Sequence, residues 1–317
     1  MDVASQEGRI LRVEKSSIHD GEGLRSVVFF KGCPMRCAWC STPESQNFEP
    51  EIGIDRSKCV LCGDCVAVCP YDALNINSGA LSLDRERCTG CFECADACSK
   101  RAIKKYGASV LVQEIANEVS KDEVFYFHSG GGVTLSGGEP CSQPVYAAAL
   151  LKQLRMTGIH TAMESALFAP WENVEAILPH LDALFVDIKH MDPIKHEQWT
   201  GVDSGLILDN LRKIDRSTYP LPITIRIPLI PGVNDGDSNL RELSRFTHEL
   251  PDKLKAVELL PYHRLGLATY RMLDKEYSLG DTPVLPWDWL AARAQFLSSC
   301  KPAVPVFAGG SVFQPER

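Results

Sequence analysis

Three cysteines, Cys33, Cys37 and Cys40, have C-x3-C-x2-C spacing and follow an apolar run in the stretch SVVFFKGCPMRCAWC. Thiolates are soft ligands, and three of them on one short loop can hold three irons of a [4Fe–4S] cube. The fourth iron of such a cube stays open, so it can bind a substrate or a cofactor and pass it an electron. The spacing therefore predicts an iron–sulfur centre with redox chemistry.

Eight further cysteines form an internal repeat. The run C-x2-C-x2-C-x3-C occurs at 59–69 and again at 88–98, each time followed by a polar turn and an apolar pair. One supersecondary unit is thus used twice, with the spacing of bacterial two-cluster ferredoxins. A pair of structural zinc sites is the alternative, although zinc favours separate C-x2-C pairs over two four-cysteine runs.

The cysteine count of 13 raises a second alternative, a disulfide framework. Against it, the chain is long, the count is odd, and the first residues, MDVASQEGRI, show no secretory signal. Cys141 follows a Gly-rich loop, and Cys300 lies in an apolar C-terminal stretch with helical periodicity. We expect both to pack as small core residues rather than to act chemically.

The composition limits the class of protein. A chain of 317 residues with 44% hydrophobic content can build one large α/β domain with an insert, or two domains. A net charge of −8 argues against a general nucleic-acid binder. No run of about 18 apolar residues occurs, so no membrane span is expected. We therefore predict a cytoplasmic protein without nucleic-acid or membrane partners.

The elements that must position these motifs alternate along the chain. Six runs rich in Val, Ile, Leu and Phe predict buried strands, at 26–31, 133–136, 160–164, 183–189, 223–230 and 256–261. Stretches with helical periodicity lie between or after them, at 110–123, 145–156, 171–178, 206–216, 238–249 and 286–300. This alternation predicts a parallel α/β barrel or open sheet. Because polar motifs follow the strands, we expect them to meet at the carboxyl ends, on one rim.

Five motifs together resemble the activating enzymes of glycyl radical enzymes, a group within the radical S-adenosylmethionine (SAM) superfamily. They are the cysteine triplet with Trp39, HDGEGLR (19–25), GGVTLSGGEP (131–140), VDIKHMD (186–192) and LLPYH (259–263). The resemblance is to the subgroup with a two-cluster insert; pyruvate formate-lyase activating enzyme is a relative without it. It implies a partial (β/α)6 TIM-like barrel from 1–54 and 105–317, with an inserted α+β bacterial ferredoxin-like domain at 55–104.

The resemblance also implies three [4Fe–4S] clusters. The first is held by the triplet Cys33, Cys37 and Cys40 and binds SAM. In two-cluster ferredoxins the fourth cysteine of each run ligates the other cluster. The implied ligands of the second cluster are therefore Cys59, Cys62, Cys65 and Cys98, and those of the third are Cys69, Cys88, Cys91 and Cys94.

The resemblance assigns further residues to the SAM pocket. It implies that the SAM amino group meets the segment Gly137, Gly138 and Glu139, and that the carboxylate side meets Lys189 and Arg226. Because Arg226 lies inside the apolar run ITIRIPLI, it needs a partner, and the SAM carboxylate would be one. Trp39 and His263 are placed beside the cofactor, and a monovalent cation, Na⁺ or K⁺, would bind Glu164, Ser165 and Asp187. A strand-end salt bridge is the alternative for Asp187 with Lys189.

The implied function is reductive cleavage of SAM to a 5′-deoxyadenosyl radical, which takes a glycine Cα hydrogen from a partner glycyl radical enzyme under anaerobic conditions. The electron would come from flavodoxin or ferredoxin, and the insert could relay it. Asp20 is expected to touch the partner's glycyl loop. Two departures are Glu22, where the family motif has Pro, and Thr42, where relatives have Asn. A radical SAM enzyme acting on a small molecule and an electron-transfer iron–sulfur protein remain alternatives.

Overall fold

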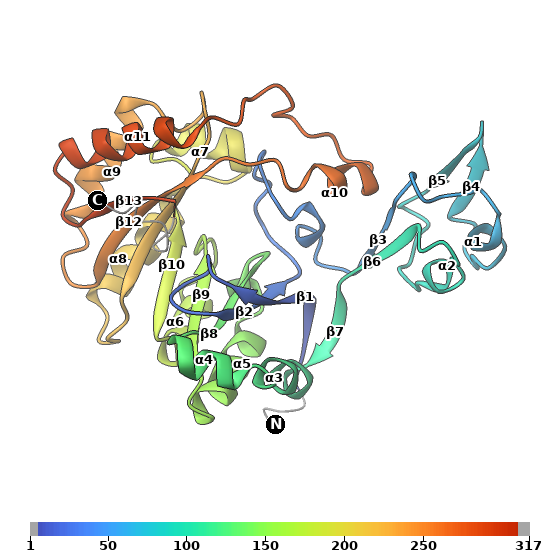
Figure 1. Cartoon of the computed structure of the whole chain (residues 1–317), viewed down its shortest axis with the longest axis horizontal. Coiled ribbons are helices and arrows are strands. Elements are labelled where there is room, and N and C mark those ends of the chain that lie inside the picture. Colours follow the sequence, from blue (N-terminus) through green and yellow to red (C-terminus); the bar gives the residue numbers. More distant parts are fainter. Residues whose placement is uncertain (1–5, 310–317) are drawn as a thin grey trace.

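The computed structural model describes residues 6–309, and its largest element is an open nine-stranded sheet (Figure 1). Seven neighbouring strands are parallel: β2 (Arg25–Phe30), β8 (Gly132–Gly137), β9 (His160–Ser165), β10 (Ala183–Asp187), β11 (Ile223–Leu229), β12 (Leu254–Pro261) and β13 (Val306–Ala308). Two antiparallel strands, β1 (Glu7–Ser17) and β7 (Ala108–Leu111), extend the sheet beyond β2. The strand order runs from β13 to β7, so the curved sheet forms a partial barrel.

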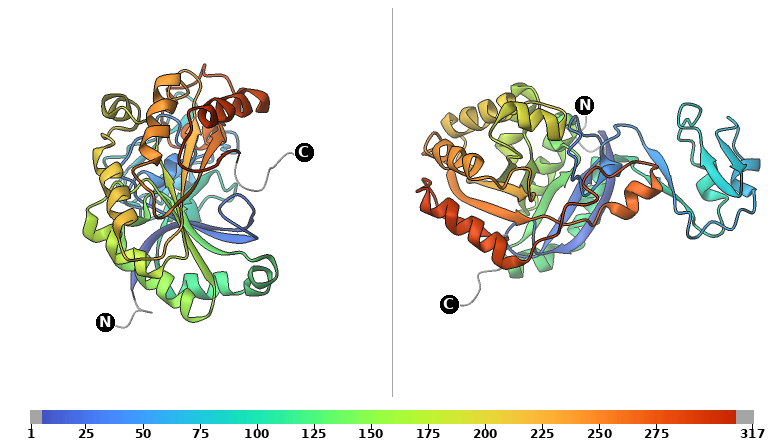
Figure 2. Two further views of the ribbon diagram at one scale, coloured as in Figure 1. Left: turned by 90° about the vertical axis from the view of Figure 1, so that its left-hand side faces the viewer. Right: turned by 90° about the horizontal axis from the view of Figure 1, so that it is seen from above.

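Helices cover the outer side of this sheet (Figure 2). They are α3 (Val112–Ser120), α4 (Glu123–Ser129), α5 (Pro144–Met156), α6 (Trp171–Ile177), α8 (Gly205–Arg216), α9 (Asp237–Thr247) and α11 (Trp287–Ser299). Their apolar faces meet the strands in one core; in α8, for example, Ile207, Leu211 and Ile214 recur at helical spacing and are buried. Helix α7 (Pro193–Thr200) contacts the loop that follows β2, and α10 (Leu267–Met272) lies toward the small lobe. None of the helices within residues 6–309 is long and apolar enough to cross a membrane.

The predicted α/β class with parallel strands is confirmed, and the six predicted strands correspond to β2 and β8–β12. The sequence analysis missed β1, β7, β13, α4, α7 and α10. Strand β1 has no continuous apolar run, because only its first half alternates between exposed and buried positions. Helix α7 has the polar sequence PIKHEQWT, and α10 has only six residues, so neither gives a clear periodic signal.

A small lobe projects from the barrel between β2 and β7 (Figures 1 and 2). Two antiparallel strands, β3 (Glu51–Ile54) and β6 (Ile103–Tyr106), connect it to the barrel. Beyond them lie the hairpin β4 (Leu74–Asn77) and β5 (Ala80–Leu83) and two single-turn helices, α1 (Asp64–Ala67) and α2 (Glu93–Asp96). The lobe has its own apolar core, which includes Ile52, Ile54, Leu74, Leu81 and Ile103 together with Cys65 and Cys94.

Candidate iron–sulfur and cofactor site

The loop that carries the cysteine triplet follows β2 and is held by backbone hydrogen bonds at both ends. Near its start, the Gly32 N–H donates to the Ser45 carbonyl at 2.7 Å, in the short 3-10 helix Pro43–Ser45. Near its end, the N–H groups of Arg36 and Ala38 donate to the last carbonyls of α7, at 2.6 and 2.9 Å. These α7 carbonyls have no partner inside the helix, so the loop caps α7 while α7 fixes the loop.

The three thiols of this loop lie close enough together to affect one another electrostatically. Burial raises the pKa of all three, that of Cys37 to about 12, and the neighbouring thiols add to the rise at Cys33 and Cys37. The charge of Lys189 opposes the rise at Cys37 and Cys40. Metal ligation requires thiolates, so a cluster bound here would displace the three thiol protons.

Two further observations agree with a bulky cofactor here. The buried indole Nε1 of Trp39 has no hydrogen-bond partner within the described residues. Within residues 6–309, no three His, Cys, Asp or Glu side chains are grouped tightly enough to hold a single metal ion. A cube does not require such a group, because each thiolate binds a different iron. The donor set therefore fits a cluster with three cysteine ligands.

Gly137 and Gly138, which precede Glu139, allow the backbone at the end of β8 to approach the cysteine loop closely. A Cβ atom on Gly138 would lie 2.3 Å from the Gly32 carbonyl oxygen, and Gly137 has a φ of +98°. The N–H groups of Gly138 and Glu139 donate to the carbonyls of Phe30 and Gly32, both at 2.9 Å. The end of β8 thus packs directly against the start of the cysteine loop.

The carboxylate of Glu139 points into the core rather than toward the rim. It is 1% exposed and accepts hydrogen bonds from the Ser165 hydroxyl at 2.6 Å and from the N–H groups of Cys141 and Ala166, both at 3.0 Å. Burial raises its pKa, and the hydroxyl and N–H donors oppose that rise. The side chain joins the ends of β8 and β9, and the SAM contact expected for this segment stays a prediction.

Arg226 finds its charged partners inside the chain. Its guanidinium donates to Glu258 at 2.8 Å, to the Glu164 carboxylate, and to the His19 carbonyl at 3.1 Å, and it stacks on the Phe185 ring at 3.9 Å. The sequence analysis missed Glu258. The feature that could have indicated it is a single carboxylate within the apolar strand β12. The register of β11 against β12 places Glu258 beside Arg226.

The three expected cation ligands are not brought together by their side chains. Glu164 and Ser165 are adjacent in β9, so they point to opposite faces of the sheet. Ser165 bonds Glu139, whereas Glu164 bonds the Ser136 hydroxyl and Arg226. Asp187 pairs with Lys189, Oδ2 to Nζ at 2.5 Å, which is the salt bridge considered as the alternative. The cation site stays a prediction that rests on the resemblance alone.

Lys189 is close to both Asp187 and the cysteine loop. It is 8% exposed; burial opposes its charge, but the Asp187 carboxylate and the thiols of Cys37 and Cys40 raise its pKa above the usual value. The side chain is therefore held charged beside the triplet, where it can attract an anionic group of a ligand.

Asp20 and His263 lie at different depths of the site. Thr134 donates to the Asp20 carbonyl at 2.7 Å, the Ser17 hydroxyl donates to its carboxylate, and its charge helps to raise the pKa of Glu164, which burial brings to about 7. Asp20 is therefore close enough to interact electrostatically with the cluster of Arg226, Glu164 and Glu258, called the Arg226 cluster below. His263 follows β12 at the surface, where its Nδ1 accepts from the Leu265 N–H at 3.4 Å.

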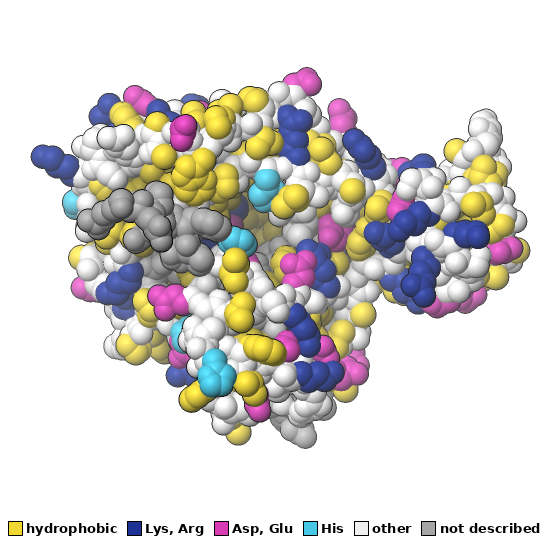
Figure 3. Space-filling model, viewed as in Figure 1, with side chains coloured by type: hydrophobic (Ala, Val, Ile, Leu, Met, Phe, Trp, Pro, Cys, Tyr) yellow, Lys and Arg dark blue, Asp and Glu magenta, His cyan; other side chains and the backbone are white. Residues whose placement is uncertain are grey.

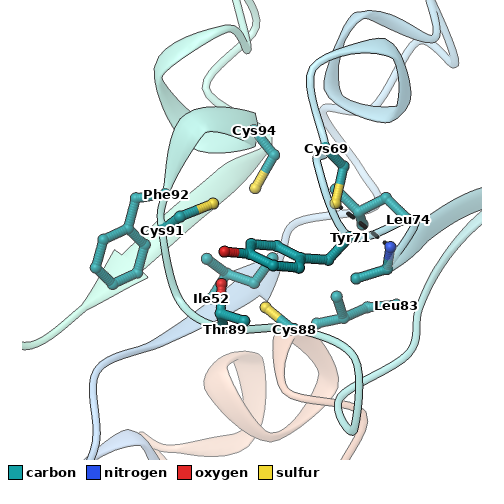
Figure 4. A pocket seen from close by; sticks show the side chains of 11 residues that line it. Ile52, Cys69, Tyr71, Leu74, Leu83, Cys88, Thr89, Cys91, Phe92 and Cys94 are labelled. Atoms are coloured by element: carbon teal, nitrogen blue, oxygen red, sulfur yellow. Dashed lines mark hydrogen bonds between the residues drawn. The ribbon is translucent and has the colours of Figure 1, made fainter.

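The eight cysteines of the repeat line two pockets of the lobe, four in each. Figure 4 shows the first pocket, where the side chains of Cys69, Cys88, Cys91 and Cys94 surround a space into which Tyr71 reaches. The second pocket is lined by Cys59, Cys62, Cys65 and Cys98. Each pocket thus combines three cysteines of one run with the fourth of the other, the grouping expected from the ferredoxin spacing.

The two pockets are related by the repeat. Equivalent positions are 29 residues apart, so the N–H of Ala73 donates to the Cys69 sulfur and the N–H of Ala102 to the Cys98 sulfur, both at 3.3 Å. Tyr71 in the first pocket corresponds to Lys100 in the second. The same fold unit therefore offers four soft donors twice, which fits a [4Fe–4S] cluster in each pocket.

The remaining cysteines occupy different environments. Cys141 is fully buried in the barrel core, with its sulfur 3.6 Å from the Ser165 hydroxyl. Cys300 is the C-cap of α11 and is only partly buried; its thiol donates to the Phe296 carbonyl at 3.3 Å. The expectation of a core position for Cys300 was therefore wrong, because the helix ends one residue earlier.

Comparison with known proteins agrees with this architecture. The profile of the Radical SAM superfamily matches residues 85–243, that of a 4Fe-4S dicluster domain matches 51–99, and that of a 4Fe-4S single cluster domain matches 19–61. A solved radical SAM methyltransferase from Sphaerobacter thermophilus is similar in fold, with a TM-score of 0.54 and 13% identity, over 94% of this chain and 76% of that chain. Fold and profiles define a radical SAM protein with additional iron–sulfur domains.

Characterised relatives narrow the class. The isethionate sulfite-lyase activating enzyme of Oleidesulfovibrio alaskensis is 43% identical, over 86% of this chain and 89% of that protein. The trans-4-hydroxy-L-proline dehydratase activating enzyme of Clostridioides difficile is 41% identical, over 84% and 88%. The chain therefore belongs to the glycyl radical enzyme activating enzymes of the radical SAM superfamily. Iron–sulfur clusters and SAM are its cofactors, and its protein substrate is a glycyl radical enzyme.

Proposed function

We propose that this chain cleaves SAM reductively and uses the resulting radical to activate one glycine of its partner. The cluster that Cys33, Cys37 and Cys40 would hold would supply one electron for breaking a carbon–sulfur bond of SAM, giving methionine and a 5′-deoxyadenosyl radical. That radical would take the glycine Cα hydrogen and leave as 5′-deoxyadenosine. The observation that carries this proposal is the placement of the partly buried triplet Cys33, Cys37 and Cys40 beside Lys189, which follows the carboxyl end of β10.

The chain's own residues contribute binding, orientation and exclusion of water. Lys189 holds a positive charge near Cys37 and Cys40, where the carboxylate of SAM would pair with it. Gly137 and Gly138 let β8 pack directly against the cysteine loop, and this contact fixes the position of the loop at the carboxyl ends of the strands. Such positioning is what a radical reaction requires, since the hydrogen donor must be in near contact and other donors must be kept out.

We propose further that residues 55–104 form a ferredoxin-like domain with two [4Fe–4S] clusters, in the pockets of Cys69, Cys88, Cys91 and Cys94 and of Cys59, Cys62, Cys65 and Cys98. The support is that each pocket gathers four cysteines from both halves of the repeat. These clusters would take an electron from flavodoxin or ferredoxin and pass it to the cluster at the barrel rim.

The test is to measure iron, deoxyadenosine and glycyl radical in the same preparation. Protein reconstituted without oxygen should hold about 12 irons, in three cubes of four. With dithionite, SAM and the partner enzyme, it should form 5′-deoxyadenosine together with a glycyl radical signal in electron paramagnetic resonance. The triple variant C33A/C37A/C40A should keep about 8 irons and form neither product.

Other results would favour the alternatives. Deoxyadenosine formation that depends on a small molecule, without a glycyl radical on any partner, would support a small-molecule radical SAM enzyme. Full iron content without SAM cleavage in the unaltered protein would support an electron-transfer protein. Deoxyadenosine formation retained by the triple variant would falsify the assignment of the site cysteines.

A further inference from the structure

The repeat in the lobe begins before its cysteines. Asp55 and Arg56 stand 29 residues before Asp84 and Arg85, the same offset as between the cysteine runs. Both aspartates make the same local turn: Asp55 accepts from the Ser57 N–H at 3.2 Å, and Asp84 accepts from the Glu86 N–H at 2.9 Å. The two arginines are therefore equivalent positions of one duplicated unit.

Both arginines reach out of the lobe to the same short segment of the barrel, the end of α10. Arg56 donates to the Arg271 carbonyl at 3.4 Å and pairs with Asp274 at 2.7 Å. Arg85 donates to the Leu273 carbonyl at 2.7 Å and, through its other terminal nitrogen, to the Ile52 carbonyl at 3.3 Å. A helix leaves its last carbonyls unpaired and carries partial negative charge there, so two guanidinium groups are suitable caps.

The same segment of chain touches the cysteine loop of the barrel. At the start of α10, a Cβ on Gly266 would lie 2.8 Å from the Ser41 carbonyl oxygen and 3.0 Å from that of Cys40, so the two backbones are in direct contact. Just after α10, Lys275 donates to the Pro43 carbonyl at 3.0 Å. The segment 266–275 is therefore packed against the site loop as well as against the lobe.

Without these contacts the lobe depends on a slender connection. Among the described residues, β3 and β6 are the strands that join it to the barrel, and a two-stranded ribbon is marginally stable on its own. This ribbon also touches α10 directly, where the Tyr106 hydroxyl donates to the Met272 sulfur at 3.3 Å. Figure 3 shows Lys and Arg side chains gathered at the junction of lobe and barrel. Arg85 adds a side-chain link between the ribbon and the barrel, because it bonds both β3 and the residue that follows α10.

We propose that Arg56 and Arg85 are positioning residues that lock the lobe onto the end of α10 and so set the distance over which electrons pass to the site loop. The inference rests on the proposed function, because it concerns delivery of electrons to the cluster at Cys33, Cys37 and Cys40. It assigns to the duplicated unit a mechanical role beyond ligating metal.

The test compares the holoprotein variant R56A/R85A with the control K58A/R87A. Lys58 and Arg87 are also equivalent positions of the repeat, but within the described residues their ion pairs are local, with Asp55 and Asp84, both at 3.5 Å. Each double variant removes two positive charges. In R56A/R85A, hydrogen exchange at 267–275 and in β3 and β6 should rise about fivefold or more, as for a loss of roughly 1 kcal/mol, while the control resembles the unaltered protein.

The proposed role in electron delivery is tested by comparing two reductants, flavodoxin and dithionite. With reduced flavodoxin, R56A/R85A should form deoxyadenosine about tenfold more slowly than the control, about 1.4 kcal/mol in barrier. With dithionite, which reaches the site cluster directly, the two variants should be equal. Unchanged hydrogen exchange would overturn the clamp, and equal rates with flavodoxin would overturn its role in electron delivery. If the unaltered protein forms no deoxyadenosine with dithionite, the proposed function fails instead, whatever the clamp does.

Discussion

At the scale of single residues, buried charge decides which motif positions bind ligands and which hold the fold. Glu139 lies in the motif expected to meet SAM, yet its carboxylate accepts three hydrogen bonds from Cys141, Ser165 and Ala166 within the core. A carboxylate satisfied in this way is costly to alter, because any donor left without an acceptor stays buried. Its contribution to the site is therefore to hold the ends of β8 and β9 together.

We expect the substitution Glu139→Gln to lower stability without changing the affinity for SAM. A Gln amide would bring its NH2 group against one of the three donors, at a cost of roughly 1–3 kcal/mol in the free energy of unfolding. Urea denaturation and equilibrium SAM binding measure the two quantities. Glu175→Gln, at an exposed position of α6, is the matched control and should change neither. A tenfold loss of SAM affinity at unchanged stability would contradict the positioning role.

Arg226 and Glu258 form a buried charge pair, and we expect the effects of replacing them on the free energy of unfolding to be strongly non-additive. R226M takes the cation from both Glu258 and Glu164 and should cost about 3–5 kcal/mol. E258M leaves Arg226 paired with Glu164 and should cost less, and R226M/E258M removes both charges of the pair and should recover part of the loss caused by R226M. Glu164 keeps its hydrogen bond from Ser136 in every variant. Urea denaturation of the four proteins gives the coupling energy; a double variant as unstable as the sum of the two singles would show that the pair is not a unit.

Some of these residues could be predicted from the sequence and others could not. The cysteine sets are predictable because ligand chemistry restricts their spacing, and the structure gathers them by fours into two pockets. The partner of Arg226 was not predictable, because its contact with Glu258 depends on the register of β11 against β12. The direction of Glu139 was hidden for the same reason, since the donors that it meets lie in other elements.

At the scale of elements, the alternation of apolar runs predicts the parallel strands. It does not predict the two elements that hold the cysteine loop, α7 and the segment around α10. Helix α7 and the segment around α10 contact that loop through backbone atoms of 199–200 and 266. Backbone contacts leave little trace in side-chain periodicity. Both elements are therefore among those that the sequence analysis missed.

The packing of β8 against the cysteine loop predicts a severe effect of Gly138→Ala. The new Cβ would lie 2.3 Å from the Gly32 carbonyl oxygen, so one backbone must move, at a cost of about 2 kcal/mol or more. We expect lower thermal stability and incomplete loading of the site cluster, seen as about 8 irons rather than 12. Gly236→Ala is the control, because nothing lies within 4 Å of its Cβ position and its φ is −66°. Normal loading of both variants would contradict the proposed packing role.

At the scale of the whole molecule, the proposed function requires two partner sites, one for an electron donor at the lobe and one for the protein substrate at the carboxyl ends of the strands. The segment 18–22 is a candidate contact for the protein substrate, because it lies at the Arg226 cluster and begins at the exposed Ile18. Its backbone is held from the sheet, by Thr134 at the Asp20 carbonyl and by Arg226 at the His19 carbonyl. A change of the Asp20 side chain should therefore leave the segment in place.

The substitution Asp20→Asn separates the two functions of the rim. It keeps the size of the side chain but removes its charge, which we propose binds the extended glycyl loop of the partner. A charged hydrogen bond is worth roughly 1.5–3 kcal/mol, so glycyl radical formation should fall about tenfold or more. SAM affinity and dithionite-driven deoxyadenosine formation without the partner should not change. Electron paramagnetic resonance and a deoxyadenosine assay on the same samples decide the matter; if both signals fall together, Asp20 belongs to the SAM pocket and not to the partner's site.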